Sequence, residues 1–190
     1  MSLPGKYSLW LCPSGDSNSQ VLLNEIITEC SKPLGAPHFH PHITLFSPVF
    51  ANSDSDALTQ VREYIVKLHS ELDKDALSAG IPFRASKVAI GGKYYQCVLL
   101  EEQGSAVLAQ ANAIARQHWN ANNQPDFYPH ASLVYGDYSK SKRKQIAADV
   151  IAMLPGDIEQ LSFFTSEIRV VQTEGPCEQW RDIGSIHIFS

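Results

Sequence analysis

Two short segments of the chain repeat the same residue types around a histidine. Residues 39–45 run F-H-P-H-I-T-L, and residues 127–133 run F-Y-P-H-A-S-L. Both fit the pattern F-x-P-H-x-[T/S]-L, and their histidines, His42 and His130, lie 88 residues apart. One histidine followed by a hydroxyl residue is common and says little, but two copies with matching neighbours predict a shared catalytic site.

The residue types in the two motifs suit acid–base catalysis. Histidine titrates near neutral pH, so of two histidines one can be neutral and act as a base while the other is charged and acts as an acid. Thr44 and Ser132 can donate hydrogen bonds to oxygens on which negative charge develops. The repeat makes the assignment of acid and base reversible on sequence alone.

Each motif is expected on a β-strand, which would place its polar residues together. Side chains alternate between the two faces of a strand, so the histidine and the hydroxyl residue two positions later share one face. The alternate positions are apolar and can face a hydrophobic layer: Ile43, Leu45, Ala131 and Leu133. The motifs therefore predict strands with one face toward a cleft and the other toward a core.

Apolar periodicity and turn residues predict the remaining elements. Helices are expected at residues 20–31, 57–72, 106–121 and 139–153. Strands are expected at residues 7–12, 40–45, 82–90, 94–100, 127–134, 158–171 and 183–189, with a turn at Ser47-Pro48 and a hairpin turn at Gly91-Gly92-Lys93. This mixture predicts an α+β fold with antiparallel sheet. Because the motif occurs twice and no linker divides the chain, we expect one domain, residues 1–190, with two pseudo-symmetric lobes around a cleft.

Charge and composition argue against several classes of protein. The net charge is -5, whereas proteins that bind long nucleic acids usually carry a basic face. A small phosphorylated ligand remains compatible with this charge. No stretch approaches about 18 apolar residues, and the apolar run at the N-terminus is too short for a signal peptide. We expect a cytoplasmic monomer with no membrane contact.

The cysteines and the remaining histidines offer little for metal binding. Four cysteines lie far apart, without zinc spacing, and are expected to be buried or idle thiols: Cys12, Cys30, Cys97 and Cys177. His38, His40 and His42 alternate and could form a zinc site on one face of a strand. That run contains no carboxylate or cysteine, and a histidine bound to metal through its reactive nitrogen cannot also move a proton. We therefore expect no metal and no cofactor.

The paired H-x-[T/S] motifs resemble the signatures of the two-histidine (2H) phosphoesterase superfamily. With Tyr7-Ser8-Leu9-Trp10 and Gln96-Cys97-Val98, the chain resembles plant and fungal cyclic phosphodiesterases over essentially its whole length. The resemblance implies two lobes of antiparallel strands, helices outside, and a water-filled cleft. It also implies metal-independent hydrolysis of ADP-ribose 1″,2″-cyclic phosphate and of nucleoside 2′,3′-cyclic phosphates, downstream of tRNA splicing. Plant relatives carry disulfides, and no full set of pairs maps onto these four cysteines.

The resemblance further implies roles for individual residues. His130 would be the base, His42 the acid, and Thr44 and Ser132 the phosphate-binding groups. Tyr135, three residues after Ser132, matches a family tyrosine that adds a donor or positions the water. A nucleoside also needs a flat apolar partner, for which the candidates are Trp10, in the strand expected beside the cleft, and Tyr94, Tyr95 and Trp180.

Two other functions stay open. An RNA-acting 2H phosphoesterase should have a basic groove, against which the net charge of -5 argues. A non-enzymatic nucleotide-binding module should have lost at least one motif histidine, and both are present.

Overall fold

The main sheet carries both motifs at its centre. The structure is a computed structural model that describes residues 3–15, 17–73, 77, 80–154 and 156–189. Among these residues, seven antiparallel strands form a sheet in the order β4-β5-β6-β2-β1-β8-β9, and β3 pairs with β7 in a second sheet. The strands are β1 (Gly5–Leu11), β2 (Ile43–Ala51), β3 (Ile81–Phe83), β4 (Ala85–Ile90), β5 (Val98–Glu102), β6 (His130–Val134), β7 (Phe163–Thr165), β8 (Glu167–Gln172) and β9 (Arg181–His187).

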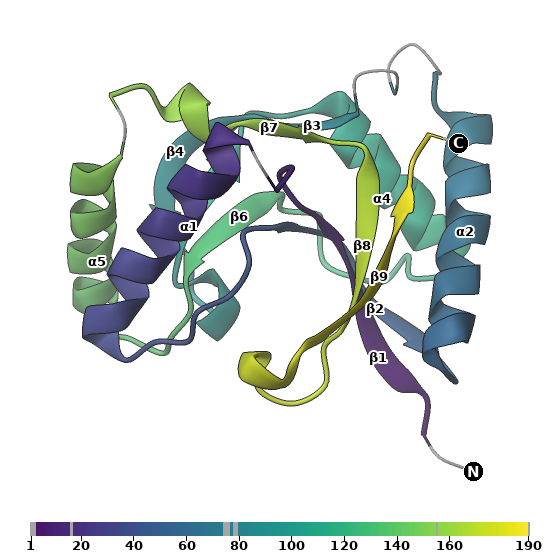
Figure 1. Cartoon of the computed structure of the whole chain (residues 1–190), viewed down its shortest axis with the longest axis horizontal. Coiled ribbons are helices and arrows are strands. Elements are labelled where there is room, and N and C mark those ends of the chain that lie inside the picture. Colours follow the sequence, from purple (N-terminus) through teal and green to yellow (C-terminus); the bar gives the residue numbers. More distant parts are fainter. Residues whose placement is uncertain (1–2, 16, 74–76, 78–79, 155, 190) are drawn as a thin grey trace.

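Among the described residues, long helices pack on the outer side of the sheet, two on each half (Figure 1). They are α1 (Asn18–Ser31), α2 (Asp54–Glu71), α4 (Ala106–His118) and α5 (Lys140–Met153). Each follows a serine whose hydroxyl accepts a hydrogen bond from the backbone N–H three residues later: Ser17, Ser53, Ser105 and Ser139. Helices α1 and α5 contact the β4-β5-β6 half, and α2 and α4 contact the half that contains β1 and β2. The α+β prediction is confirmed.

The two halves of the sheet meet at the motifs. Strands β2 and β6 are paired at Ile43 and Ala131, the residues that follow the two motif histidines. As the alternation predicts, Ile43, Leu45, Ala131 and Leu133 are buried, with at most 1% of each side chain exposed. The apolar positions of both motifs thus form the core, and the polar positions face the opposite side of the sheet.

The predicted turn at Ser47-Pro48 is wrong, because β2 continues to Ala51. In the pairing with β1, Phe46 lies opposite Leu9 and Val49 lies opposite Tyr7. Two residues of β2, Ser47 and Pro48, therefore face one residue of β1. A bulge of this kind accommodates a proline inside a strand, since the inserted residue makes no ladder hydrogen bond.

Each predicted strand differs from the structure at one or both ends, and three of them also divide or include a 3-10 turn. Residues 82–90 divide between β3 and β4, which lie in separate sheets, and residues 158–171 divide into a 3-10 turn, η3 (Ile158–Leu161), followed by β7 and β8. Residues 94–96 form another 3-10 turn, η2 (Tyr94–Gln96), because the Gln96 N–H donates to the Lys93 carbonyl at 3.0 Å. The expected tight Gly-Gly turn is therefore a longer connection, residues 91–97. Two more 3-10 turns are η1 (Lys32–Leu34) and η4 (Cys177–Gln179).

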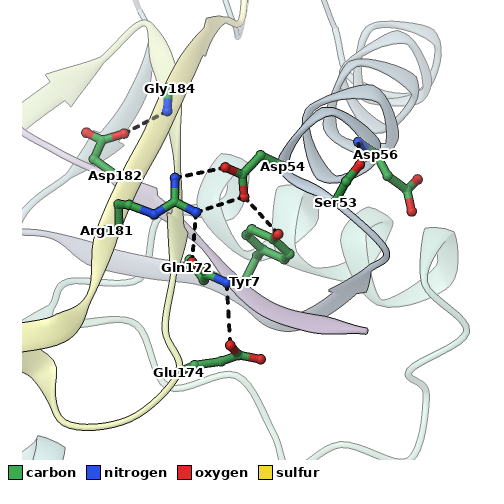
Figure 2. A network of polar contacts seen from close by, with 9 residues as sticks. All are labelled: Tyr7, Ser53, Asp54, Asp56, Gln172, Glu174, Arg181, Asp182 and Gly184. Atoms are coloured by element: carbon green, nitrogen blue, oxygen red, sulfur yellow. Dashed lines mark hydrogen bonds and ion pairs between the residues drawn. The ribbon is translucent and has the colours of Figure 1, made fainter. Parts of the chain in front are cut away.

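A polar clasp joins the start of α2 to β1 and β9 (Figure 2). The Tyr7 hydroxyl donates to Asp54 Oδ1 at 2.9 Å, and the Arg181 guanidinium donates to both Asp54 oxygens at 2.8 and 3.0 Å. Arg181 also donates to Gln172 Oε1 at 2.8 Å. Hydrogen bonding to Arg181 is the main cause of the lowered pKa of Asp54. The clasp fixes both ends of the β8–β9 connection, which carries Trp180.

No helix within the described residues has the length and apolar character needed to cross a membrane.

Candidate active site

A cleft of about 760 Å³ opens where β2 and β6 meet. All five residues predicted to act as catalytic or phosphate-binding groups line it: His42, Thr44, His130, Ser132 and Tyr135. Its size lies within the range of small-molecule sites, about 300–1,000 Å³. Because the strands are antiparallel, the register places His42 on the side of Ser132 and Thr44 on the side of His130. Residues far apart in sequence are thus combined in one site.

The two motif histidines are held in the same way. His42 Nδ1 lies 2.7 Å from the carbonyl oxygen of His40, and His130 Nδ1 lies 2.7 Å from that of Tyr128. A carbonyl can only accept, so Nδ1 of each neutral ring carries the proton and donates it. Nε2 then carries the lone pair, and no protein partner of either Nε2 is found among the described residues. Each imidazole can therefore take up or release a proton at Nε2.

Burial makes both imidazoles prefer the neutral form. His42 is 5% exposed, and loss of solvation lowers its pKa to about 4. Burial also lowers the pKa of His130, which is partly exposed, and the positive charge of Lys93 adds to this effect. A phosphate anion bound between the rings would raise both pKa values, because a nearby opposite charge favours the protonated ring.

An aromatic side chain lies against each imidazole. The Trp10 ring stacks on His42 with centroids 3.7 Å apart and planes 10° apart, and its Nε1 donates to Ser8 Oγ at 3.1 Å. The Tyr128 ring lies 5.4 Å from the His130 ring, and its hydroxyl donates to Glu101 Oε1 at 2.6 Å. These contacts fix the planes of the two rings.

Trp10 therefore has a role that the sequence did not indicate. It lines the cleft but is 5% exposed, and one face of its ring is covered by His42. Tyr95 and Trp180 also line the cleft, with ring centroids 5.4 Å apart. Tyr94 packs edge-on against Tyr95 at 5.0 Å. Stacking of a base on any of these rings stays a prediction.

The two motif hydroxyls differ in their surroundings. Ser132 Oγ donates to the carbonyl oxygen of Tyr95 at 2.7 Å and lies beside the Tyr135 side chain. Thr44 is half-buried and has no hydrogen-bond partner for its hydroxyl among the described residues. The Tyr135 ring is buried and stacks on Phe39 with centroids 3.7 Å apart. Ser132 is thus tied to the protein, whereas the Thr44 hydroxyl is available to a ligand.

Several polar residues of the cleft were missed by the sequence reasoning. The cleft is also lined by three cations, Lys6, Lys93 and Arg116, and by two carboxylates, Asp126 and Glu174. The two glycines before Lys93 predict a turn there and no site residue, and Lys6 and Arg116 carry no motif. No signal in the sequence places Lys6 and Arg116 in the same cleft as the histidines, since they come from different elements.

The structure does not form the zinc site considered for residues 38–42. Strand β2 begins only at Ile43, so the expected alternation is lost: His38 and His40 are exposed, whereas His42 is buried. Across the described ranges, no three or more His, Cys, Asp or Glu side chains are grouped so that they could hold a metal ion. The four cysteines are free thiols, and burial raises the pKa of Cys12 to about 12 and those of Cys30 and Cys177 to about 11.

Comparisons with known proteins agree with this geometry. The family model of the cyclic phosphodiesterase-like proteins matches residues 6–188. The chain is 23% identical to a cyclic phosphodiesterase of Arabidopsis thaliana, covering 88% of this chain and 85% of that protein. It is 24% identical to a 2′,3′-cyclic-nucleotide 3′-phosphodiesterase of Kluyveromyces lactis, covering 95% and 98%.

The fold is also known from solved structures. The crystal structure of E. coli LigT in the apo form matches 98% of this chain and 98% of its own length, with a TM-score of 0.61 and 11% sequence identity. At this identity the likeness concerns the fold alone, and it agrees with the α+β architecture described above. Since the family model spans nearly the whole chain, the protein is a phosphoesterase that belongs to the cyclic phosphodiesterase family, within the 2H phosphoesterase superfamily.

Proposed function

We propose that this protein opens small cyclic phosphates by hydrolysis. It would convert nucleoside 2′,3′-cyclic phosphates to nucleoside 2′-phosphates, and ADP-ribose 1″,2″-cyclic phosphate to ADP-ribose 1″-phosphate. The observation that carries the proposal is the pair of imidazoles in one cleft, each with Nδ1 bound to a carbonyl and Nε2 without a partner among the residues that the structure describes. The printed activities of the Arabidopsis thaliana and Kluyveromyces lactis relatives support the same reaction class.

In the proposed reaction His130 is the base and His42 is the acid. His130 Nε2 takes a proton from water, whose oxygen forms a bond to phosphorus. The bond between phosphorus and the 3′ oxygen of the ribose breaks, and protonated His42 gives its Nε2 proton to that oxygen. The greater exposure of His130 supports this assignment, because the attacking water must come from solvent. The negative charge of the substrate would keep His42 protonated despite its burial.

The remaining features of the proposal follow from the cleft. Thr44 and Ser132 would bind the phosphate oxygens, with Tyr135 beside Ser132. Because a serine hydroxyl has one proton to donate, Ser132 would turn it from the Tyr95 carbonyl to the phosphate when substrate binds. The nucleoside would contact the aromatic rings at the cleft. We also propose that residues 1–190 act as one domain, with the two halves of the sheet as its lobes, and that the protein is a cytoplasmic monomer.

Incubation with the four nucleoside 2′,3′-cyclic phosphates and with ADP-ribose 1″,2″-cyclic phosphate tests the function. We expect 2′-phosphates and ADP-ribose 1″-phosphate as products, identified by chromatography and ³¹P NMR. An oligoribonucleotide that ends in a 2′,3′-cyclic phosphate tests the RNA-acting alternative in competition. Binding of these ligands without any turnover would support the non-enzymatic alternative and contradict the proposal.

The rate should depend on pH in a bell-shaped way, with the optimum of kcat/KM below pH 6.5. This parameter reports the free protein, in which burial lowers the pKa of His42 to about 4 and also lowers the pKa of His130. At pH below both values His130 is protonated and cannot act as the base, and at pH above both values His42 has lost the proton that the acid must give, so kcat/KM falls on either side. The kcat profile should lie at higher pH, because bound phosphate raises both pKa values. A kcat/KM that is constant from pH 4 to 8 would contradict this mechanism.

Folding must be checked over the same pH range. The unfolded chain binds a proton at His42 near pH 6.5, but the folded chain resists protonation until about pH 4. The unfolded state therefore holds more protons in this window, and stability falls as the pH drops through it. Circular dichroism at each pH separates this loss of fold from the loss of the base.

Activity should be unchanged by excess EDTA. Each task that a metal would perform is assigned to a protein group, with water activation given to His130 and leaving-group protonation to His42. Assays before and after chelation, with elemental analysis of the purified protein, check this. One tightly held metal per chain, whose removal abolishes activity and whose return restores it, would overturn the mechanism.

A further inference from the structure

The β4–β5 connection, residues 91–97, has a defined conformation that presents Lys93. The Gly91 N–H donates to the Cys97 carbonyl at 3.3 Å, and the Gln96 N–H donates to the Lys93 carbonyl at 3.0 Å. A Cβ atom at position 91 would lie 2.1 Å from the Gln96 carbonyl oxygen. Only glycine permits this close approach, so the turn depends on Gly91.

Three groups from outside hold the same connection in place. The Arg143 guanidinium, buried on α5, donates to the Gly91 carbonyl on one side of Lys93. On the other side, the Gly136 N–H donates to the Tyr94 carbonyl at 3.0 Å, and Ser132 Oγ donates to the Tyr95 carbonyl. The backbone of Lys93 is therefore tied both to α5 and to the second motif.

Lys93 brings an uncompensated positive charge to the cleft beside His130. Its side chain is exposed and lines the cleft, and no carboxylate within the described residues forms an ion pair with it. Its charge is close enough to lower the pKa of His130. By contrast, the guanidinium of Arg116, another cation of the cleft, is engaged with the Gln124 carbonyl.

The proposed reaction needs such a charge. A cyclic phosphodiester is an anion, and negative charge grows on its oxygens as water adds. The hydroxyls of Thr44 and Ser132 are neutral, and the acid His42 gives up its charge during the step. A cation that stays charged throughout stabilises the transition state and the phosphate product.

We propose that Lys93 is a further phosphate-binding residue, whose ammonium group contacts the substrate phosphate on the His130 side of the cleft. The proposal rests on the proposed function and adds to it a charged group outside the two motifs. It also gives the 91–97 connection a purpose, because its hydrogen bonds fix the point from which the lysine side chain extends.

Substitution of the charge tests the role of Lys93. Lys93→Met keeps the length of the side chain and removes the charge, and Lys93→Arg keeps the charge. Lys144→Met is the matched control, since Lys144 is exposed on α5 and does not line the cleft. We expect kcat/KM to fall about 10-fold to 100-fold in Lys93→Met, the loss of one hydrogen bond to a charged group, and to stay within about 3-fold of the parent in Lys93→Arg. We expect Lys144→Met to equal the parent.

The dependence of kcat/KM on ionic strength and the affinity for inorganic phosphate test whether Lys93 contacts the phosphate. A merely structural role of Lys93 would leave both unchanged. The parent kcat/KM should fall as ionic strength rises, and this dependence should be weaker in Lys93→Met. Inorganic phosphate, titrated by ³¹P NMR or calorimetry, should bind more weakly to Lys93→Met than to Lys93→Arg. This binding is measured without turnover, so it tests Lys93 even if the parent opens no cyclic phosphate, a result that would refute the proposed function instead. If Lys93→Met keeps kcat/KM, phosphate affinity and salt dependence within twofold of the parent, Lys93 is not a phosphate-binding residue.

Discussion

His42→Ala and His130→Ala should each lower kcat for cyclic phosphate hydrolysis by about 10²–10⁴, the usual effect of losing a general acid or base. In the described part of the chain neither Nε2 has a protein partner, and each Nδ1 is bound to a backbone carbonyl two residues earlier. Alanine removes the only group at either position that can move a proton. Steady-state kinetics on a nucleoside 2′,3′-cyclic phosphate, with circular dichroism to confirm folding, measure the effect.

The double variant and a control make the test specific. If the two histidines act in one step, the loss of both should cost little more than the larger single loss, because residues of one catalytic unit are not additive. His38→Ala is the matched control, since His38 is exposed in the same segment and does not line the cleft. A folded His42→Ala or His130→Ala variant that keeps a near-normal rate would refute the two-histidine mechanism.

The central features of the fold and site could be predicted because they are local patterns. The alternation of polar and apolar residues in each motif fixes which side chains face the core, and Ile43 and Ala131 are buried as this alternation requires. The repeat itself implies that the two strands share a cleft. These inferences need only the period of a strand and the chemistry of histidine.

Other features depend on contacts between distant segments and could not be predicted. Trp10 stacks on His42 because β1 pairs with β2, and this register also allows the bulge that carries Pro48. The predicted β4–β5 hairpin forms, but the tight turn expected at residues 91–93 is wrong, because residues 91–97 form a longer connection whose carbonyls accept hydrogen bonds from Ser132 and Arg143. Periodicity within one segment contains no information about such partners.

The two motifs have similar sequences, but their histidines have different surroundings. His42 is buried beneath Trp10, whereas His130 is partly exposed beside Tyr128. The positive charge of Lys93 also contributes to the lowered pKa of His130. The sequence repeat alone leaves the acid and base roles reversible, and these differences in burial and charge are what can distinguish them. The same asymmetry extends to the motif hydroxyls and leads to the second large effect that we expect.

Thr44→Ala and Ser132→Ala should each weaken transition-state stabilisation by about 2–4 kcal/mol, the effect of removing one donor from a developing anion. Their effects on stability should differ, however. Ser132 donates to the Tyr95 carbonyl at 2.7 Å, and alanine would remove that bond at a cost of about 1 kcal/mol to the free energy of unfolding. The Thr44 hydroxyl has no partner among the described residues, so its removal should cost less stability.

Measurement of kcat/KM and of urea unfolding for each variant separates catalysis from folding. Thr44→Ser and Ser132→Thr are the matched controls, because they keep the hydroxyl, and they should retain most of the activity that the alanine variants lose. Thr44→Ala should then combine a large loss of kcat/KM with near-parental stability, which is the combination expected of a group that acts on the substrate alone. A large loss of stability with intact activity would instead assign Thr44 to the structure of the sheet. Equal stability of Ser132→Ala and the parent would contradict the hydrogen bond that ties the second motif to Tyr95.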